Sequence, residues 1–367
     1  MSLTFSREAK TLIVLLLLLL GFGLAILSSA GIIDAQRRFG SSYYYLISQL
    51  QTGVLVGAVL FLIASQISYR FWKKLALPIL LGCLLLLLLV FVPGVGYAAK
   101  GATRWIHIGN FNFQPSEVLK LGLIIYFAAW FGKQGDNKLK NWAYSTLPFL
   151  TVLGFAVLML GLQPDIGTLG IVICIAIALY FFAGAPVKHL LALLLLLAVC
   201  FTFLALLSPY RFNRLLAFAR PESDTRGISY HINQSKIAIA RGGWFGVGFG
   251  QSKQKESFLP EPVGDSVFAV AVEEVGLVGS GFLIALYLAL IWKLTAIARQ
   301  ARDKFAALYV LGVAVWIGVQ SFINMAAISG LVPLTGIPLP FVSFGGTALA
   351  VLLGSLGIVA NIANQNA

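Results

Sequence analysis

Residues 208–267, SPYRFNRLLAFARPESDTRGISYHINQSKIAIARGGWFGVGFGQSKQKESFLPEPVGDSV, form a polar, charged and glycine-rich stretch of sixty positions. The chain around it is almost wholly apolar: 59% of its 367 residues are hydrophobic, and the mean hydropathy is +0.91. Such a composition is typical of an integral membrane protein, in which polar groups are costly and usually functional. The fold therefore depends on how the apolar runs on both sides of this segment cross the membrane.

Ten apolar windows predict transmembrane spans, because about 20 residues are needed to cross roughly 30 Å of hydrocarbon. We predict an all-α polytopic membrane protein with about ten transmembrane helices in a single domain, residues 1–367, with 208–267 as one large extracytoplasmic loop between helices seven and eight. The first window follows basic residues as a signal sequence would, but many spans follow it, so we interpret it as an uncleaved span. The spans are expected near 11–30, 46–67, 75–93, 117–132, 146–162, 165–183, 188–207, 266–294, 304–327 and 346–364.

The distribution of basic residues favours cytoplasmic termini in a bacterial inner membrane. An even number of spans places both termini on one side; with that side cytoplasmic, the inner segments hold thirteen basic residues and the outer segments twelve, eight of them in 208–267. Long loops are translocated largely regardless of charge, so leaving this loop out gives thirteen against four. The net charge of +13 then reflects topology and anionic membrane lipids. No basic helix or RNA-type motif indicates nucleic acid.

The cysteines and histidines indicate no metal or redox chemistry. Cys83, Cys174 and Cys200 all lie within apolar runs, where they are expected to be small core residues. The three histidines are scattered and have no metal-ligand spacing. No cofactor is therefore predicted with certainty; a divalent cation, Mg²⁺ or Mn²⁺, is compatible with the chain, but no cluster of ligands demands one.

Four of the predicted spans begin at the outer face with unusual polar motifs. Each motif alone is explained as a helix start, with proline near the first helical position and an acid in the first turn. Four starts on one face also present unpaired N–H groups and partial positive charge, which suit a phosphate or pyrophosphate. With arginines in the outer segments, they favour an anionic substrate that carries a lipid tail. The motifs are Gln114-Pro115-Ser116-Glu117, Gln163-Pro164-Asp165, Pro260 to Asp265, and Pro340 to Gly346; the outer cations include Arg104, Arg211, Arg214, Arg220, Arg226, Lys253 and Lys255.

Charged residues inside the apolar windows need partners. Glu117 and Lys120 lie three positions apart, so they are expected to pair on one helix face. The pair is either structural or part of a site, and removing one member would leave a buried, uncompensated charge. Glu273 and Glu274 lie two turns into the eighth span, and at least one must face the protein interior, with a role that the residues alone do not assign.

Asp265 stands where the polar segment meets the eighth span. One interpretation is a helix N-cap, because aspartate is a favoured capping residue. The other is a partly desolvated carboxylate at the water–lipid boundary, with a pKa raised toward that of a useful base. The residues alone leave both interpretations open.

At these positions the chain resembles the SEDS family (shape, elongation, division and sporulation), which includes RodA and FtsW, and the resemblance runs nearly end to end. Gly242 to Ser252 and Gln320 to Asn324 are more similar to the division member, FtsW, whereas Thr335 to Pro340 suits either branch. The motifs that carry the resemblance are Gly101-Ala102-Thr103-Arg104-Trp105-Ile106, Gln114-Pro115-Ser116-Glu117 with Lys120, Gln163-Pro164-Asp165-Ile166-Gly167-Thr168, Pro209-Tyr210-Arg211, Gln234-Ser235, Leu259-Pro260-Glu261 followed by Asp265, and Pro338 to Gly346.

The resemblance implies a ten-span inner-membrane fold and a peptidoglycan glycosyltransferase that polymerises lipid II onto a growing lipid-linked glycan. It also implies a class B penicillin-binding protein, a transpeptidase, as partner. The family's catalytic aspartate falls on Asp265, and its important glutamate and lysine fall on Glu117 and Lys120. The chain departs from the family's usual His-Thr-Asp-Phe, since Val263-Gly264 precede the aspartate, so a mechanism that needs that histidine is in doubt.

We therefore expect an inverting displacement of undecaprenyl pyrophosphate at the outer face, with Asp265 as the base. The alternative is a lipid II flippase, which would need polar groups through the whole depth of the membrane; a scaffolding role is a further one. The polar motifs gather at the outer ends, which favours the enzyme. The residues expected to bind substrate are Glu117, Lys120, Arg104, Gln114, Asp165, Arg211, Arg214, Lys255, Glu261 and Ser343.

Overall fold

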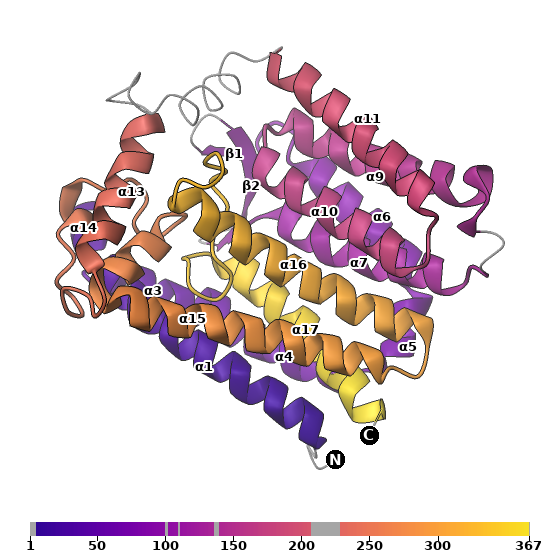
Figure 1. Cartoon of the computed structure of the whole chain (residues 1–367), viewed down its shortest axis with the longest axis horizontal. Helices are drawn as coiled ribbons and strands as arrows, with labels where there is room; N and C mark the ends of the chain where they lie inside the picture. Colours follow the sequence, from indigo (N-terminus) through magenta and orange to yellow (C-terminus); the bar gives the residue numbers. More distant parts are fainter. Residues whose placement is uncertain (1–4, 100–101, 109–110, 136–138, 207–227, 367) are drawn as a thin grey trace.

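A computed structural model describes residues 5–99, 102–108, 111–135, 139–206 and 228–366 as a bundle of long helices (Figure 1). Both chain termini lie at one end of the bundle, here called the terminal end; the small sheet and α13 lie at the other, here called the loop end (Figure 1). The elements of the first half are α1 (Arg7–Ala30), α2 (Ile32–Phe39), α3 (Tyr44–Ser48), the π-helix η1 (Gln49–Leu55), α4 (Val56–Gln66), α5 (Tyr69–Lys74), α6 (Ala76–Leu89), β1 (Gly96–Ala99), β2 (Ala102–Ile108), β3 (Phe111–Phe113) and α7 (Pro115–Gly132). Those of the second half are the π-helix η2 (Trp142–Thr146), α9 (Leu147–Leu162), α10 (Ile166–Phe182), α11 (Val187–Leu206), α13 (Ile228–Gly242), α14 (Gln254–Ser257), α15 (Val267–Arg299), α16 (Lys304–Ile328) and α17 (Gly346–Asn366).

The helices are those of a multi-pass membrane protein. Each of the ten predicted windows coincides with helix in the structure. Within the described residues, six helices are long and apolar enough to cross a membrane. They are Arg7–Ala30, Tyr44–Gln66, Trp142–Leu162, Val267–Arg299, Lys304–Ile328 and Gly346–Gln365. The others are shorter or carry charges, so the count of ten spans stays a prediction.

Helix α17 lies at the centre and is buried along nearly its whole length. Its closest neighbour is α4, and small residues let the two backbones approach. A Cβ atom at Gly357 would lie 2.4 Å from the carbonyl oxygen of Phe61, and one at Gly57 would lie 2.6 Å from the side chain of Leu353. Helix α16 packs beside α17 and between α15 and α10 (Figure 1). The α16–α17 connection, residues 329–345, thus enters the protein interior.

A three-stranded antiparallel sheet, in the order β1-β2-β3, departs from the purely helical expectation. It lies in the segment that precedes the fourth predicted span. The residues joining β2 to β3 in the sequence are Gly109 and Asn110, a pair typical of tight hairpins. The strand β2 brings Arg104 toward the starts of α7 and α10.

The segment 208–267 is partly helical. Its residues from 228 onward contain α13 and α14. Residues 207–227 lie outside the described part of the chain. The segment also packs against α15: its residues 243–248 fill a break in that helix at Gly276.

Gly276 has φ 69° and ψ −172°, a conformation that side chains disfavour. A Cβ atom there would lie 2.3 Å from the backbone nitrogen of Gly246 and 2.5 Å from the carbonyl oxygen of Trp244. We therefore expect Gly276→Ala to destabilise the protein by at least about 1–3 kcal/mol. Gly281→Ala is the control, because an added Cβ there meets nothing within 4 Å; in the same helix it should be neutral or slightly stabilising. Thermal unfolding in detergent measures both, and equal midpoints would contradict the expectation.

Candidate active site

The start of α10 is held at the loop end by Arg104 of β2. Its Nε donates a hydrogen bond to the carbonyl oxygen of Gln163 at 3.1 Å, its Nη2 donates to that of Pro164, and its Nη1 lies 3.7 Å from Asp165 Oδ1. Asp165 is the N-cap of α10, and its Oδ2 accepts a hydrogen bond from Ser116 Oγ at 3.4 Å. The two predicted motifs with Gln-Pro sequences are therefore in contact, and the Arg104 side chain remains 33% exposed.

The starts of α15 and α17 are joined in the same way. Ser343 Oγ donates to the carbonyl oxygen of Gly264 at 2.6 Å and accepts from the backbone N–H of Leu339 at 2.7 Å. In addition, the N–H of Phe344 donates to the carbonyl oxygen of Val263 at 2.8 Å. Thr347 Oγ1 also donates to the carbonyl oxygen of Asn112 in β3. Because β3 leads directly into α7, this bond joins the start of α17 to the segment that precedes α7. All four helix starts thus belong to one cluster.

Asp265 occupies the last turn before α15. The N-cap of that helix is Ser266, so the interpretation of Asp265 as the cap is wrong. The backbone of Asp265 is held by Asn324 of α16, whose Nδ2 donates to the carbonyl oxygens of Asp265 at 2.8 Å and Ile337 at 2.7 Å. Its side chain is partly exposed, and a Cβ atom at Gly336 would lie 3.9 Å from Asp265 Oδ2. The carboxylate therefore faces the α16–α17 connection at the loop end.

His231 of α13 approaches the same turn. Its Nε2 lies 2.5 Å from Ser266 Oγ, which donates its own hydrogen to the carbonyl oxygen of Pro260 at 2.7 Å. Because the hydroxyl has only one hydrogen, Nε2 must be the donor in the contact with Ser266. An imidazole thus contacts Ser266, the residue that follows the aspartate, although Val263 and Gly264 stand where the family commonly has His-Thr.

Glu117 and Lys120 form the predicted ion pair, with 2.8 Å between Lys120 Nζ and Glu117 Oε1. The two side chains are only 3% and 1% exposed. Lys120 Nζ also donates to Gln320 Oε1 at 3.0 Å and lies 4.7 Å from the centre of the Trp316 ring. Gln320 in turn donates from Nε2 to the carbonyl oxygen of Pro338 at 2.9 Å. The pair is therefore tied to α16 and, through Gln320, to the α16–α17 connection.

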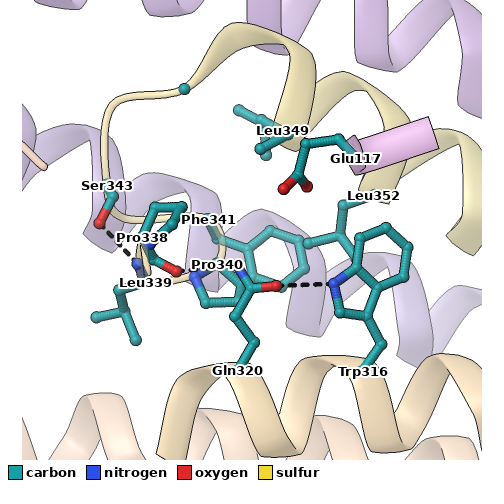
Figure 2. Close-up of a pocket in the computed structure, with 12 residues that line it drawn as sticks. Glu117, Trp316, Gln320, Pro338, Leu339, Pro340, Phe341, Ser343, Leu349 and Leu352 are labelled. Atoms are coloured by element: carbon teal, nitrogen blue, oxygen red, sulfur yellow. Dashed lines mark hydrogen bonds between the residues drawn. The ribbon is translucent and has the colours of Figure 1, made fainter. Parts of the chain in front are cut away.

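A small, partly open pocket of about 20 Å³ adjoins this network. Figure 2 shows Glu117 on one side of it, opposite Trp316 and Gln320 from α16, with Ser343, Pro338 and Leu339 of the α16–α17 connection lining its left side in this view. Glu117 Oε2 is buried, and no described residue lies within hydrogen-bond distance of it. The pocket thus contains an acceptor that a ligand's O–H or N–H could use.

Gln49 was not predicted, and it orients the wall of this pocket. It lies at the start of the π-helix η1, a feature that often marks functional sites. Its Oε1 accepts from the N–H of Gly345 at 2.9 Å, and its Nε2 donates to the carbonyl oxygen of Ser343 at 3.4 Å. In the sequence, Gln49 could have been identified only as a polar residue near the edge of an apolar window. Gln320 and Asn324 gave a clearer one, since they are polar and four positions apart within a span.

Replacing Gln49 with alanine should leave the partly buried N–H of Gly345 without its acceptor, at a cost of about 0.5–1.5 kcal/mol. The unfolding midpoint in detergent should fall. Gln51→Ala is the matched control, because Gln51 is two positions away and exposed. Equal midpoints for the two variants would show that Gln49 does not hold this wall.

The other predicted residues lie away from the pocket or outside the described part of the chain. Lys255 is buried, and its Nζ donates to Glu274 Oε1 at 2.6 Å, Ser29 Oγ at 2.7 Å and the carbonyl oxygen of Gly250 at 2.9 Å. Its three hydrogens are therefore used, and its position indicates a structural role instead of substrate contact. Glu274 and its neighbour Glu273 likewise have assigned partners. Arg211 and Arg214 lie outside the described residues.

Glu261 and Gln114 flank the cluster. Glu261 has φ 51°, and its carbonyl oxygen accepts from the N–H groups of Gly264 and Ser266, which folds the turn that carries Asp265. The pKa of the Arg38 guanidinium is raised, chiefly by Asp34, with smaller contributions from Tyr45 and Glu261. Gln114 is the N-cap position of α7, but its side chain makes no capping hydrogen bond.

Comparisons with known proteins agree on one family. Residues 10–367 match the model of the FtsW, RodA and SpoVE family, described as cell cycle proteins. The probable peptidoglycan glycosyltransferase FtsW of Geobacter sulfurreducens is 40% identical over 349 residues, covering 94% of this chain and 92% of that protein. Stage V sporulation protein E of Bacillus subtilis is 36% identical over 357 residues, covering 97% of this chain and 96% of that protein.

Two solved structures share the fold over nearly the full length. A chain from the structure described as "Structural coordination of polymerization and crosslinking by a peptidoglycan synthase complex" superposes with a TM-score of 0.83 at 28% identity, covering 100% of this chain and 99% of that one. The rod shape determining protein RodA of Thermus thermophilus superposes with a TM-score of 0.72 at 27% identity, covering 99% and 98%.

Proposed function

This chain belongs to the FtsW, RodA and SpoVE family of cell cycle proteins, and we propose that it is a peptidoglycan glycosyltransferase that polymerises lipid II at the outer face of the cytoplasmic membrane. The observation that carries the proposal is the joining of four helix starts around Asp265 and the Glu117 pocket. The names of the relatives favour a role in division, and the stretches 242–252 and 320–324 lean the same way.

In the proposed reaction, the C4 hydroxyl of one lipid-linked disaccharide attacks the anomeric carbon of a second, lipid-linked glycan. A C–O bond forms at that carbon, and the bond to undecaprenyl pyrophosphate breaks with its electron pair leaving on the pyrophosphate. An α-linked donor gives a β-linked product, so the carbon is inverted. The acceptor proton passes to Asp265, and no protein acid is needed because pyrophosphate is already a competent leaving group.

The helix starts supply the electrostatic part of the proposal. The N–H groups at the starts of α7, α10, α15 and α17 carry partial positive charge that suits a pyrophosphate. Arg104 adds a full charge, since its guanidinium is one-third exposed at the junction of α7 and α10. Arg211 and Arg214 remain candidates for the same role. A pre-arranged set of donors of this kind stabilises charge that develops as the bond breaks.

The burial of Lys120 supports a positioning role over direct contact with pyrophosphate. Its ammonium group is occupied by Glu117, Gln320 and the face of Trp316. It therefore holds Glu117 in place, and Glu117 Oε2, which has no hydrogen-bond partner among the described residues, belongs to a side chain that lines the pocket. We propose that this oxygen accepts a hydrogen bond from a substrate hydroxyl or amide.

A divalent cation is compatible with this proposal, and it would share the charge of the pyrophosphate. The described residues include no group of three or more His, Cys, Asp and Glu side chains that could hold one. Any cation would therefore be held largely by the substrate's own phosphates, and no step above depends on it.

Transport of lipid II across the membrane is the competing proposal. One observation favours transport: a second buried polar cluster lies on η2, α10 and the start of α11. In it, Thr146 Oγ1 is 2.8 Å from Tyr180 Oη and 3.0 Å from His189 Nδ1. These groups satisfy one another. The polar groups that connect to Asp265 all belong to the loop-end cluster, which favours polymerisation.

Reconstitution separates the two. Proteoliposomes containing the purified chain, with and without its class B penicillin-binding protein, are supplied with lipid II, and glycan strands and leaflet transfer are both measured. Glycan product is expected from the chain, with more product when the partner is present. Transfer between leaflets without any glycan product, under both conditions, would overturn the proposal.

A further inference from the structure

Helix α15 is broken at Gly276, and the break is filled by the segment between α13 and α14. The N–H groups of Val247 and Gly248 donate to the carbonyl oxygens of Glu273 and Glu274 at 2.9 and 3.1 Å. On the other side of the break, the N–H groups of Leu277 and Val278 donate to the carbonyl oxygens of Gly243 and Trp244 at 2.9 and 3.0 Å. The segment thus supplies the partners that an unbroken helix would have supplied itself, as irregular backbone within a membrane requires.

The polar side of this segment faces inward. Glu273 receives hydrogen bonds from Ser252 Oγ at 2.6 Å and the N–H of Lys253 at 3.3 Å, and Arg241 Nη1 lies 3.3 Å from it. Glu274 is paired with the buried Lys255. Two carboxylates and two cations therefore sit between the segment, α15 and α1, and the segment is held firmly in place.

The opposite side of the segment is apolar and exposed. The side chains of Trp244, Phe245 and Phe249 are 69%, 80% and 56% exposed. They adjoin Leu277 and Val278 of α15, which are 54% and 55% exposed. A contiguous patch of this size, with two phenylalanines and a tryptophan at its tip, marks an interaction surface. We call these five side chains the aromatic wedge.

The wedge is continuous with the lipid-facing surface of α15. Below it, Phe282, Leu288 and Trp292 are exposed in succession along the same helix. From Leu277 to Trp292 the helix rises about 22 Å, at 1.5 Å per residue. This is slightly less than the roughly 30 Å of a bilayer's hydrocarbon layer, so the wedge and Trp292 fall near its two boundaries.

Contacts between α15 and α1 also place the wedge near a membrane boundary. At the terminal end, Lys293 Nζ is bonded to Glu8; at the other, Ser29 Oγ donates to Glu274 Oε1 at 2.6 Å. Glu274 and Lys293 of α15 thus sit level with the two ends of the apolar run of α1. Aromatic side chains are enriched at such boundaries, and the exposed Lys253 beside the wedge suits anionic head groups.

We propose that the aromatic wedge inserts into the lipid leaflet on the loop-end side of the membrane, between the head groups and the first carbons of the acyl chains. Part of the segment 208–267 is then a membrane-immersed element instead of an aqueous loop. It stabilises the broken helix that begins beside Asp265. The proposal does not depend on the reaction proposed above.

Site-directed spin labelling tests the depth of the wedge. The three cysteines are replaced by alanine, one cysteine is introduced in place of Phe245, and the labelled full-length protein is placed as single copies in nanodiscs of phosphatidylethanolamine and phosphatidylglycerol. Power saturation then compares collisions with oxygen, which is enriched in lipid, and with a neutral nickel chelate, which is enriched in water. Phe282→Cys on α15 is the lipid reference, and Gln251→Cys, exposed in the same segment, is the water reference.

We expect the label at 245 to collide more with oxygen than with nickel, as at 282, and the label at 251 to show the reverse. A label at 245 as accessible to nickel as that at 251 would place the wedge in water and overturn the proposal. A label shielded from both reagents would mean that protein covers the wedge, which also overturns it. An unchanged unfolding temperature for each labelled variant shows that the fold is kept.

Discussion

Asp265→Asn protein is expected to polymerise lipid II about 10²–10⁴ times more slowly than the original chain, because a general base typically contributes that factor. Asparagine has nearly the same shape and cannot take the proton of the acceptor hydroxyl. The backbone contacts that hold this position, from Asn324 and Ser343, do not involve the carboxylate. The unfolding temperature in detergent should therefore stay close to that of the original chain.

The matched control is Glu256→Gln, which removes an exposed carboxylate from the same segment. It should leave the rate unchanged. Both proteins are assayed in the same lipid with a saturating amount of the transpeptidase partner, so that activation by the partner is not limiting. If Asp265→Asn polymerises at nearly the original rate, Asp265 is not the base.

The second large effect is expected for Lys120→Met, which leaves the Glu117 carboxylate buried at 3% exposure without its cation. Breaking a buried pair in this way costs about 3–5 kcal/mol. Detergent-solubilised protein should unfold at a clearly lower temperature or fail to accumulate. The effect follows from burial: an exposed pair of the same geometry would contribute about 0–1 kcal/mol.

The double variant Glu117→Gln with Lys120→Met separates stability from function. It removes both charges, so most of the lost stability should return, and the difference between single and double variants measures the coupling of the two residues. If the pair is only structural, the double variant also regains polymerisation. If Glu117 binds substrate, as we propose, the double variant is stable and remains impaired. A Lys120→Met protein as stable as the original chain would show that the pair is not buried as described.

The positions of the helices and the chemistry of their starts could be predicted from the sequence. Runs of apolar residues about 20 positions long have few alternatives to a membrane helix, and each predicted window coincides with one. The three-residue spacing of Glu117 and Lys120 placed them on one face, and the ion pair is confirmed. These predictions rest on local geometry, which a short stretch of sequence largely determines.

The break at Gly276 could not be predicted in this way. Its surroundings, from Val272 to Gly281, read as continuous apolar helix with two acids. The helix opens there because residues 243–248, about thirty positions earlier in the sequence, supply hydrogen bonds to the break. Arg241 and Lys255, on either side of those residues, pair with Glu273 and Glu274 and stabilise the open form. Lys255 shows the same limit of local sequence. It was predicted to contact substrate because its sequence neighbours are polar. In the structure, all three hydrogens of its ammonium group are donated, to Glu274, Ser29 and the carbonyl oxygen of Gly250.

The sequence by itself determined the membrane class, the helical windows, the family and the candidate carboxylate, because each depends on residue type and spacing along one segment. Only the tertiary structure decided which candidates meet. It brought Glu117, Gln320 and Ser343 to one pocket, assigned Gln49 and Asn324 to the support of its walls, and removed Lys255 from it. The physical reason is that buried polar groups must find partners, and those partners come from helices up to about three hundred residues apart, whose packing no local pattern encodes.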